Sequence, residues 1–240
     1  MNPSQLTNDM GQPIGQEVKN WSPRPLPPCS PMEGQLIRIE PFDIDAHAPA
    51  LFEAYSTEKT GRNWTNLPYG PFKTLAEYST HAVELMSGED PFFHTIIGKA
   101  DDKPLGVASL MRITPAYGTI EVGHISLSPA LQQTPGSTEA MYLMARRVFD
   151  ELGYRRYEWK CNALNAPSRR AATRLGFTYE GTFRKHLVVK GRNRDTAWYA
   201  MIDDDWPRIK ANFEIWLSPD NFDADGRQIQ SLNTLNGEGT

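Results

Sequence analysis

Cysteine is scarce in this 240-residue chain, and features that define several protein classes are missing. Two cysteines, Cys29 and Cys161, cannot form the disulfide framework of a small secreted domain. No run approaches the ~18 consecutive apolar residues of a membrane-spanning helix. The first ten residues also lack the basic and apolar regions of an export signal. These absences predict a globular cytoplasmic chain with no membrane partner.

Motifs of several enzyme classes are missing too. There is no Walker loop, no dinucleotide-type glycine fingerprint, no nucleophile elbow and no zinc-binding His-Glu helix. The five histidines are scattered, so no metal site is predicted. Lys plus Arg is 25 and Asp plus Glu is 29, and this formal charge of −4 provides no drive toward nucleic acid.

Proline and polar residues divide the chain into three parts. Residues 1–33 hold seven prolines, which fix φ and remove backbone donors, so we expect an extended N-terminal arm. Trp21 either pins this arm to the domain or belongs to a loosely ordered leader. Residues 218–240 are polar and glycine-rich, and we expect a C-terminal tail there. The compact domain is therefore predicted over residues 34–217.

Hydrophobic periodicity predicts the elements of that domain. Alternating apolar residues indicate strands, and apolar residues spaced by three or four indicate helices. The predicted strands are 36–42, 92–100, 104–113, 119–128, 154–162, 177–189 and 193–202, and the predicted helices are 43–56, 74–86, 138–152 and 167–175. Because strands and helices are interleaved, the fold class is α/β, an α+β mixed sheet.

The strand 119–128 carries candidate functional side chains. Strict alternation places the odd-numbered residues from Glu121 to Leu127 on one face and the even-numbered residues from Ile120 to Ser126 on the other. Glu121 and His124 then lie on opposite faces, unless a bulge intervenes.

A turn rich in Gln, Thr, Gly and Ser leads from this strand into the long helix. Unpaired N–H groups and the dipole at such a helix start suit a phosphate group without any basic residue. The alternative is a simple helix cap at Thr134, with Pro135 at the first helical position. The turn alone leaves both interpretations open.

The segment CNALNAPSRRAATRLGF (161–177) is the second informative one. Asn165 and Ser168 lie at the start of a short helix that follows a strand. In a purely structural interpretation, Asn165 is a helix cap, Ser168 is a first-turn residue, and the arginines of the helix form a solvated face.

Together the two segments resemble the GNAT acyl-CoA N-acetyltransferases, specifically the ribosomal-protein N-terminal acetyltransferase-like (RimJ/RimL-type) branch. The resemblance covers about residues 36–206, and its most specific part is N-A-P-S-R-R-A-A-T-R-L-G-F-T-Y-E-G-T-F-R. It implies a central twisted mixed sheet with helices on both faces and two splayed parallel strands. It also implies acetyl-CoA as the cofactor and CoA as a product.

The resemblance assigns contacts with acetyl-CoA to three segments: the end of the strand 119–128, the turn, and the start of the short helix. The residues so assigned are Ile125, Ser126, Leu127, Gln132, Gln133, Thr134, Gly136, Ser137, Thr138, Asn165 and Ser168. The turn departs from the family pattern Gln/Arg-x-x-Gly-x-Gly/Ala in either register. Starting from Gln133, Gly136 fits and Thr138 stands at the second small-residue position. Starting from Gln132, Pro135 and Ser137 stand at the two small-residue positions, and Pro135 also lacks an N–H. The hydroxyls of Ser137 and Thr138 are expected to compensate.

Catalysis is implied at two residues. The Ser168 hydroxyl is placed to protonate the departing CoA sulfur, whose pKa is judged from that of cysteine, about 8.5. Glu121 is the expected base, acting through water, and its alternative is an ion pair with a neighbouring strand. For His124 the alternatives are a catalytic base and a hydrogen-bonded, partly buried imidazole.

Acceptor recognition is implied for the loop 62–72 and the last hairpin. Trp64, Tyr69 and His124 are the candidate substrate-binding residues, and Arg184 and Lys185 are placed to meet an acidic group. Ordinary packing or a solvated charge explains the aromatic residues and the two cations equally well.

The predicted function is acetyl transfer to a primary amine, either a protein N-terminus or a small amine, by direct attack in a ternary complex. A polyamine- or aminoglycoside-type detoxifying acetyltransferase is one alternative, and a non-catalytic acyl-CoA-binding module is another. A homodimer formed through an edge strand or the arm is compatible with the sequence, which does not decide it.

Overall fold

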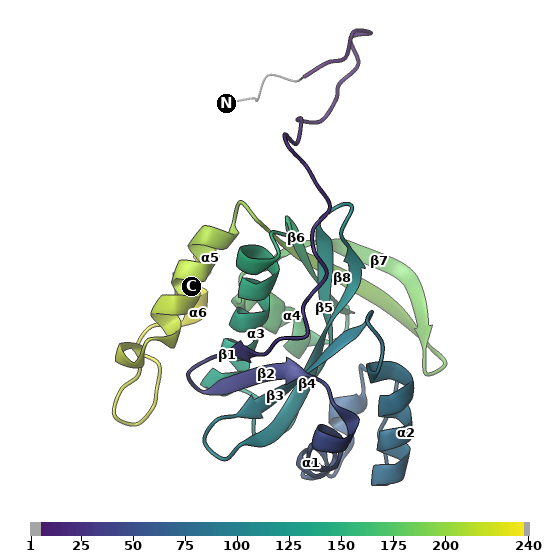
Figure 1. Ribbon diagram of the computed structural model, residues 1–240, viewed down its shortest axis with the longest axis vertical. Coiled ribbons are helices and arrows are strands. Elements are labelled where there is room, and N and C mark those ends of the chain that lie inside the picture. Colours follow the sequence, from purple (N-terminus) through teal and green to yellow (C-terminus); the bar gives the residue numbers. More distant parts are fainter. Residues whose placement is uncertain (1–5, 238–240) are drawn as a thin grey trace.

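The structure, a computed structural model, describes residues 6–237 and contains one mixed sheet with helices on both faces (Figure 1). The strands are β1 (Met32–Glu33), β2 (Ile37–Pro41), β3 (Phe92–Gly98), β4 (Lys103–Thr114), β5 (Thr119–Leu127), β6 (Arg156–Asn162), β7 (Thr178–Val189) and β8 (Arg192–Ile202). The helices are α1 (Ile44–Ser56), α2 (Leu75–Met86), α3 (Pro135–Arg146), α4 (Ala166–Arg174), α5 (Trp206–Leu217) and α6 (Leu232–Leu235). A π-helical turn, Arg147–Glu151, extends α3.

Every predicted strand and helix overlaps an observed one. The prediction lacks β1, α5 and α6. Helix α5 is the largest of these omissions, although its buried residues Trp206, Ile209, Phe213 and Trp216 recur at helical spacing.

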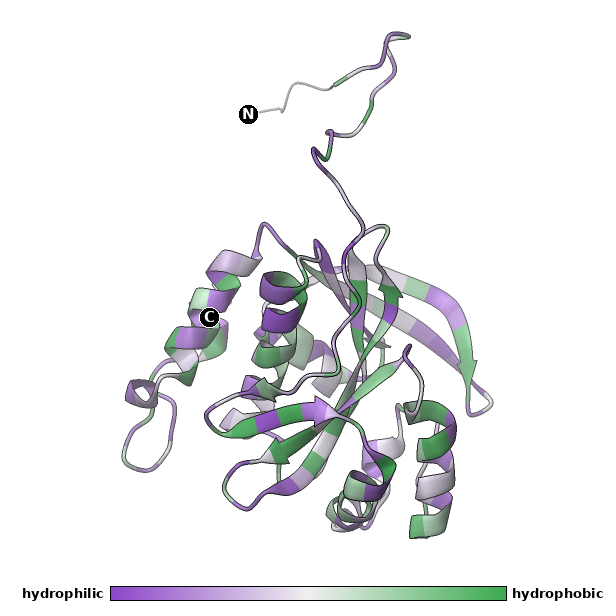
Figure 2. Ribbon diagram, viewed as in Figure 1, coloured by the Kyte–Doolittle hydropathy of each residue, from purple (hydrophilic) through white to green (hydrophobic). Residues whose placement is uncertain are grey.

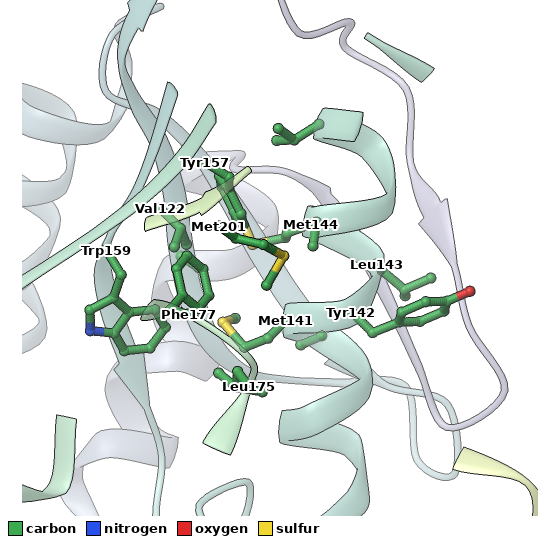
Figure 3. Packing of buried hydrophobic residues seen from close by; sticks show 14 of the residues in the cluster. Val122, Met141, Tyr142, Leu143, Met144, Tyr157, Trp159, Leu175, Phe177 and Met201 are labelled. Carbon is green, nitrogen blue, oxygen red and sulfur yellow. The ribbon is translucent and has the colours of Figure 1, made fainter. Parts of the chain in front are cut away.

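Helices cover the two faces of the sheet with separate hydrophobic cores. Helices α1 and α2 pack on one face, around Leu51, Tyr78 and Phe93. Helices α3 and α5 pack on the other, where Figure 3 shows Met141 of α3 lying against the sheet beside Phe177. We call these the α2 face and the α3 face. Figure 2 shows the matching pattern, with hydrophobic residues gathered in the central strands.

The sheet contains one parallel pair of strands. The strand order is β1-β2-β3-β4-β5-β6-β8-β7, and among the described residues only β5 and β6 run parallel. They pair from Thr119 to Val122 of β5 and from Arg156 to Trp159 of β6. Beyond these residues β5 pairs only with β4 and β6 only with β8. The predicted splayed pair is therefore confirmed.

A bulge in β5 corrects the prediction from strict alternation. Val107 and Ser109 of β4 face Ser126 and Gly123, so β5 has one extra residue there, and His124 adopts a φ of 49°. Ile120, Val122, Ile125 and Leu127 contact the α3-face core. His124 instead contacts Phe93 on the α2 face. The bulge thus brings His124 to the same face as Glu121.

The long helix begins earlier than predicted. It begins at Pro135 rather than Thr138, because the Thr134 side chain accepts a hydrogen bond from Ser137 N and caps the helix. Proline is well suited to the first helical position, where its missing N–H has no intrahelical partner to lose. The cap interpretation of Thr134 is confirmed as local structure.

Parts of both terminal segments contact the domain. Trp21 Nε1 donates to the Ala116 carbonyl at 2.9 Å, and Tyr154 donates to the Pro25 carbonyl at 3.1 Å, so the second half of the arm lies along the domain. In the segment predicted as a polar tail, Leu232 is fully buried in the α3-face core. Within residues 6–237, no helix has the length and apolarity needed to span a membrane.

Candidate active site

The Ser168 hydroxyl lies beside the point where β5 and β6 separate. Asn165 caps α4, since its Oδ1 accepts from Ser168 N at 3.2 Å. The Ser168 Oγ accepts from Trp159 Nε1 at 3.0 Å. An indole N–H only donates, so this contact occupies a lone pair of the hydroxyl and leaves its proton free to be donated.

The neighbour of that hydroxyl on β6 is a thiol. Burial raises the pKa of the Cys161 thiol, and the neighbouring Ser168 hydroxyl lowers it. A hydroxyl that lowers the pKa of a thiol stabilises the thiolate, which is the effect needed at a departing thiolate.

The side chains of the turn before α3 are mostly engaged within the protein. Gln132 Nε2 donates to the Leu127 and Asn63 oxygens, and Ser137 Oγ donates to the Thr134 carbonyl at 2.7 Å. Thr138 is buried and accepts from Arg174 at 3.0 Å. The Ser137 proton is therefore used within the turn, whereas Thr138 only accepts in its hydrogen bond, and compensation for Pro135 by these hydroxyls stays a prediction.

Backbone donors remain at this turn. Among the described residues, the N–H groups of Gln133 and Gly136 make no hydrogen bond within the protein. Gly136 is buried, and a Cβ there would come within 3.1 Å of Ile37. Arg174, predicted as part of a solvated face, instead lies against Trp216 and joins α4 to the first turn of α3. Its cation and the free N–H groups make this helix start suitable for an anion.

Glu121 lies on the α2 face in an ion-pair cluster. Its Oε2 is 2.7 Å from Arg112 and 2.8 Å from Lys160, and its side chain is 4% exposed. The ion-pair alternative is thus present in the structure. The carboxylate is therefore already paired with two cations within the protein.

His124 is held by Tyr69. The Tyr69 hydroxyl is 3.1 Å from His124 Nδ1, and the rings stack at 5.7 Å. Burial and the charge of Arg112 lower the pKa of His124 to about 4, so its ring is neutral near pH 7. Burial also raises the pKa of Tyr69, whose hydroxyl keeps its proton. With that proton donated to Nδ1, the ring carries its own proton on Nε2 and has no lone pair left for an amine.

Trp64 does not offer its face to a ligand. The indole is 8% exposed and packs against Tyr55 and Phe72 at 5.3 and 5.2 Å, so the expectation that it walls an acceptor channel is wrong. Its carbonyl instead accepts from Lys190 at 2.8 Å. That contact joins the tip of the β7–β8 hairpin to the loop 62–72.

Several charged residues of this region were absent from the prediction. Arg112 and Lys160 contact Glu121, and Arg194 is in electrostatic reach of it, whereas the predicted cations Arg184 and Lys185 are exposed on β7. Alternation along β6 and β8 gives the face of each residue within its own strand. Only the strand order and register show that Lys160 and Arg194 share a face with Glu121.

Beyond Val122 and Trp159, a gap opens between β5 and β6. A long flexible ligand fits in such a gap when a strand edge, a helix start and a proton donor all border it. This is the arrangement implied by the resemblance to GNAT acetyltransferases. The chain belongs to that family: residues 37–178 match the acetyltransferase (GNAT) domain. It is a GNAT-family N-acetyltransferase that uses acetyl-CoA.

Relatives and solved structures agree with this assignment. The chain is 26% identical to the probable N-acetyltransferase YjcK of Bacillus subtilis over 184 residues, covering 72% of this chain and 98% of that protein. A GCN5-related N-acetyltransferase from Brucella melitensis superposes with a TM-score of 0.90 at 45% identity, covering 92% of this chain and 100% of that one. A probable GNAT acetyltransferase from Chromobacterium violaceum has a TM-score of 0.76 at 36% identity, covering 82% and 98%.

Proposed function

We propose that this enzyme transfers the acetyl group of acetyl-CoA directly to a primary amine, the α-amino group of a protein or a small amine. We place it in the ribosomal-protein N-terminal acetyltransferase-like branch on the segment Asn165–Arg184. The observation that carries the proposal is the separation of β5 from β6 beside the Ser168 hydroxyl.

In this proposal the protein binds acetyl-CoA along the gap. The thioester supplies an activated acetyl group and a thiolate leaving group. The edge of β5 over 125–127 and the Asn165 amide align the pantetheine arm. The N–H groups of Gln133 and Gly136 hold the pyrophosphate together with Arg174. An N–H of β5 polarises the thioester carbonyl, and Ser168 gives its proton to the departing sulfur.

The α2 face receives the acceptor amine in the same proposal. Glu121 accepts the amine proton through water, while Tyr69 and His124 shape the acceptor side. An α-amino group, with a pKa of about 7.7–8.0, is neutral near pH 7 more often than a lysine amine, whose pKa is near 10.4, so it needs less help from a base.

The proposed function is tested by calorimetric titration of the full chain with acetyl-CoA and, in parallel, with free CoA. We expect saturable 1:1 binding, followed by thiol release when peptides with free N-termini or small amines are added. No binding of either titrant at high micromolar concentration would contradict the proposal. Binding without thiol release across the acceptor panel would instead support a non-catalytic acyl-CoA-binding module.

The role of Glu121 predicts a change in pH dependence. Glu121→Gln is expected to lower kcat/KM by about tenfold or more, because the amide cannot accept the amine proton. The acid limb of the pH–rate profile should flatten at the same time. Glu158→Gln, which removes another partner of Lys160, is the matched control and should keep the limb. An unchanged profile in Glu121→Gln would exclude Glu121 as the base.

A further inference from the structure

The α2 face of β6 and its neighbours carries a row of charges in which the carboxylates are paired. Ion pairs of 2.5–2.8 Å join Glu121, Glu158 and Glu180 to Arg112, Lys160 and Arg156. Arg194 is a fourth cation beside this row. Among the described residues, it has no carboxylate within 4.0 Å. The row and Arg194 together therefore carry one uncompensated positive charge.

Arg194 is held in place rather than free in solvent. It lies on β8 opposite Leu187, and its Nε donates to the buried Thr196 Oγ1 at 3.2 Å. Burial lowers the pKa of the Arg194 guanidinium, which is also in electrostatic reach of Glu121 and Arg112. Its positive charge in turn contributes to the lowered pKa of His124. Arg194 is thus near both β5 residues that border the acceptor side.

A partly buried guanidinium with one of its five N–H donors engaged is suited to a planar anion. Arginine binds a carboxylate through two parallel hydrogen bonds, and a partly dehydrated site strengthens them. The location matters as well, because β8 pairs with β6 as far as Asn162 and Thr196, where β6 no longer pairs with β5, and Arg194 lies two residues from Thr196 on β8. An anion bound there is close to the place where the amine must meet the thioester.

We propose that Arg194 binds a carboxylate of the acceptor, so that the preferred substrates are primary amines bearing a carboxylate close to the amino group. This inference rests on the proposed function. The carboxylate comes either from a free amino acid or from an acidic side chain next to a peptide N-terminus. Arg194 then determines acceptor specificity, because binding the carboxylate holds the amino group of the acceptor next to the gap between β5 and β6.

Two acceptor pairs distinguish these sources. Glycine is compared with glycinamide, and Ser-Asp-Phe-amide with Ser-Asn-Phe-amide, by thiol release from acetyl-CoA. In at least one pair, kcat/KM is expected to be about 10- to 100-fold higher for the anionic member, as for a desolvated charge pair. Arg194→Met should bring that ratio near 1, mainly through KM, and Arg194→Lys should retain part of it. No preference in either pair, or a preference that survives Arg194→Met, overturns the inference.

The control is Arg192→Met, which removes an exposed cation two residues away on the same strand. It should leave the acceptor preference and the activity unchanged. Titration with acetyl-CoA separates the two proposals, since Arg194→Met should bind it like the parent. If no acceptor is turned over, the affinities of the parent chain for N-acetylglycine and N-acetylglycinamide are compared by titration, and the carboxylate-bearing N-acetylglycine is expected to bind more tightly. Equal affinity of the parent chain for the two also overturns the inference.

Discussion

Ser168→Ala is expected to lower kcat by about 100-fold while leaving acetyl-CoA affinity unchanged, because the departing thiolate loses its proton donor. The hydroxyl accepts from the Trp159 indole, which occupies a lone pair and leaves its proton free for the departing sulfur. Steady-state kinetics with thiol detection and calorimetry with acetyl-CoA measure the two quantities separately.

Trp159→Phe is the matched control for this substitution. It removes the indole donor but keeps the Ser168 hydroxyl, so kcat should fall much less than in Ser168→Ala. A Ser168→Ala enzyme that acetylates as fast as its parent would refute the proton-donor role. A loss of acetyl-CoA binding would instead mean that Ser168 only shapes the start of α4.

Glu139→Ala is expected to destabilise the fold by about 4 kcal/mol, because it leaves three charge-assisted hydrogen bonds unmade. The Glu139 carboxylate, on α3, accepts from the N–H groups of Gln35, Leu36 and Ile37 at 2.6, 2.8 and 2.9 Å. It joins the turn between β1 and β2 to the helix that borders the gap. Gly34 makes room for it, since a Cβ there would lie 2.5 Å from the Glu139 Cδ.

Thermal denaturation measures this effect, and a fall in Tm of about 10 °C is expected for a domain of this size. Glu53→Ala, at an exposed position of α1, is the control and should shift Tm little. A Glu139→Ala protein with the Tm of its parent would show that the turn finds water or another acceptor.

The elements of the domain could be predicted because their periodicity is local. Helix α3 and the π-helical turn that extends it illustrate this: Ala140, Leu143, Met144 and Val148 recur at helical spacing, and all four are buried. The predicted start of the same helix, residue 138, lies after the observed start at Pro135, because apolar spacing carries no information about the cap at Thr134. Leu232, in a polar segment, is fully buried because burial depends on which surface the segment meets.

Some residues of the candidate site could likewise be predicted from local sequence, and others could not. Ser168 and Asn165 could be found because they belong to one continuous segment whose cap geometry is local. Trp64 was misassigned because an aromatic residue in a loop has the same sequence signature whether it lines a channel or fills a core. Arg194 was not found at all, since its significance depends on the ion pairs that other strands form beside it, which leave its own charge without a carboxylate partner among the described residues.

The sequence by itself determined the family, the order of the elements and the two segments that border the gap. These follow from residues close together in the chain, where spacing and caps act over a few positions. The tertiary structure alone decided which charged side chains meet on the α2 face. From the bulge at His124 onward, the residues of β5 lie on the faces opposite to those that strict alternation predicts. The strand order places β6 next to β5 and β8 next to β6, and so brings Lys160 and Arg194 near Glu121. Such contacts depend on register and strand order, which no local pattern encodes.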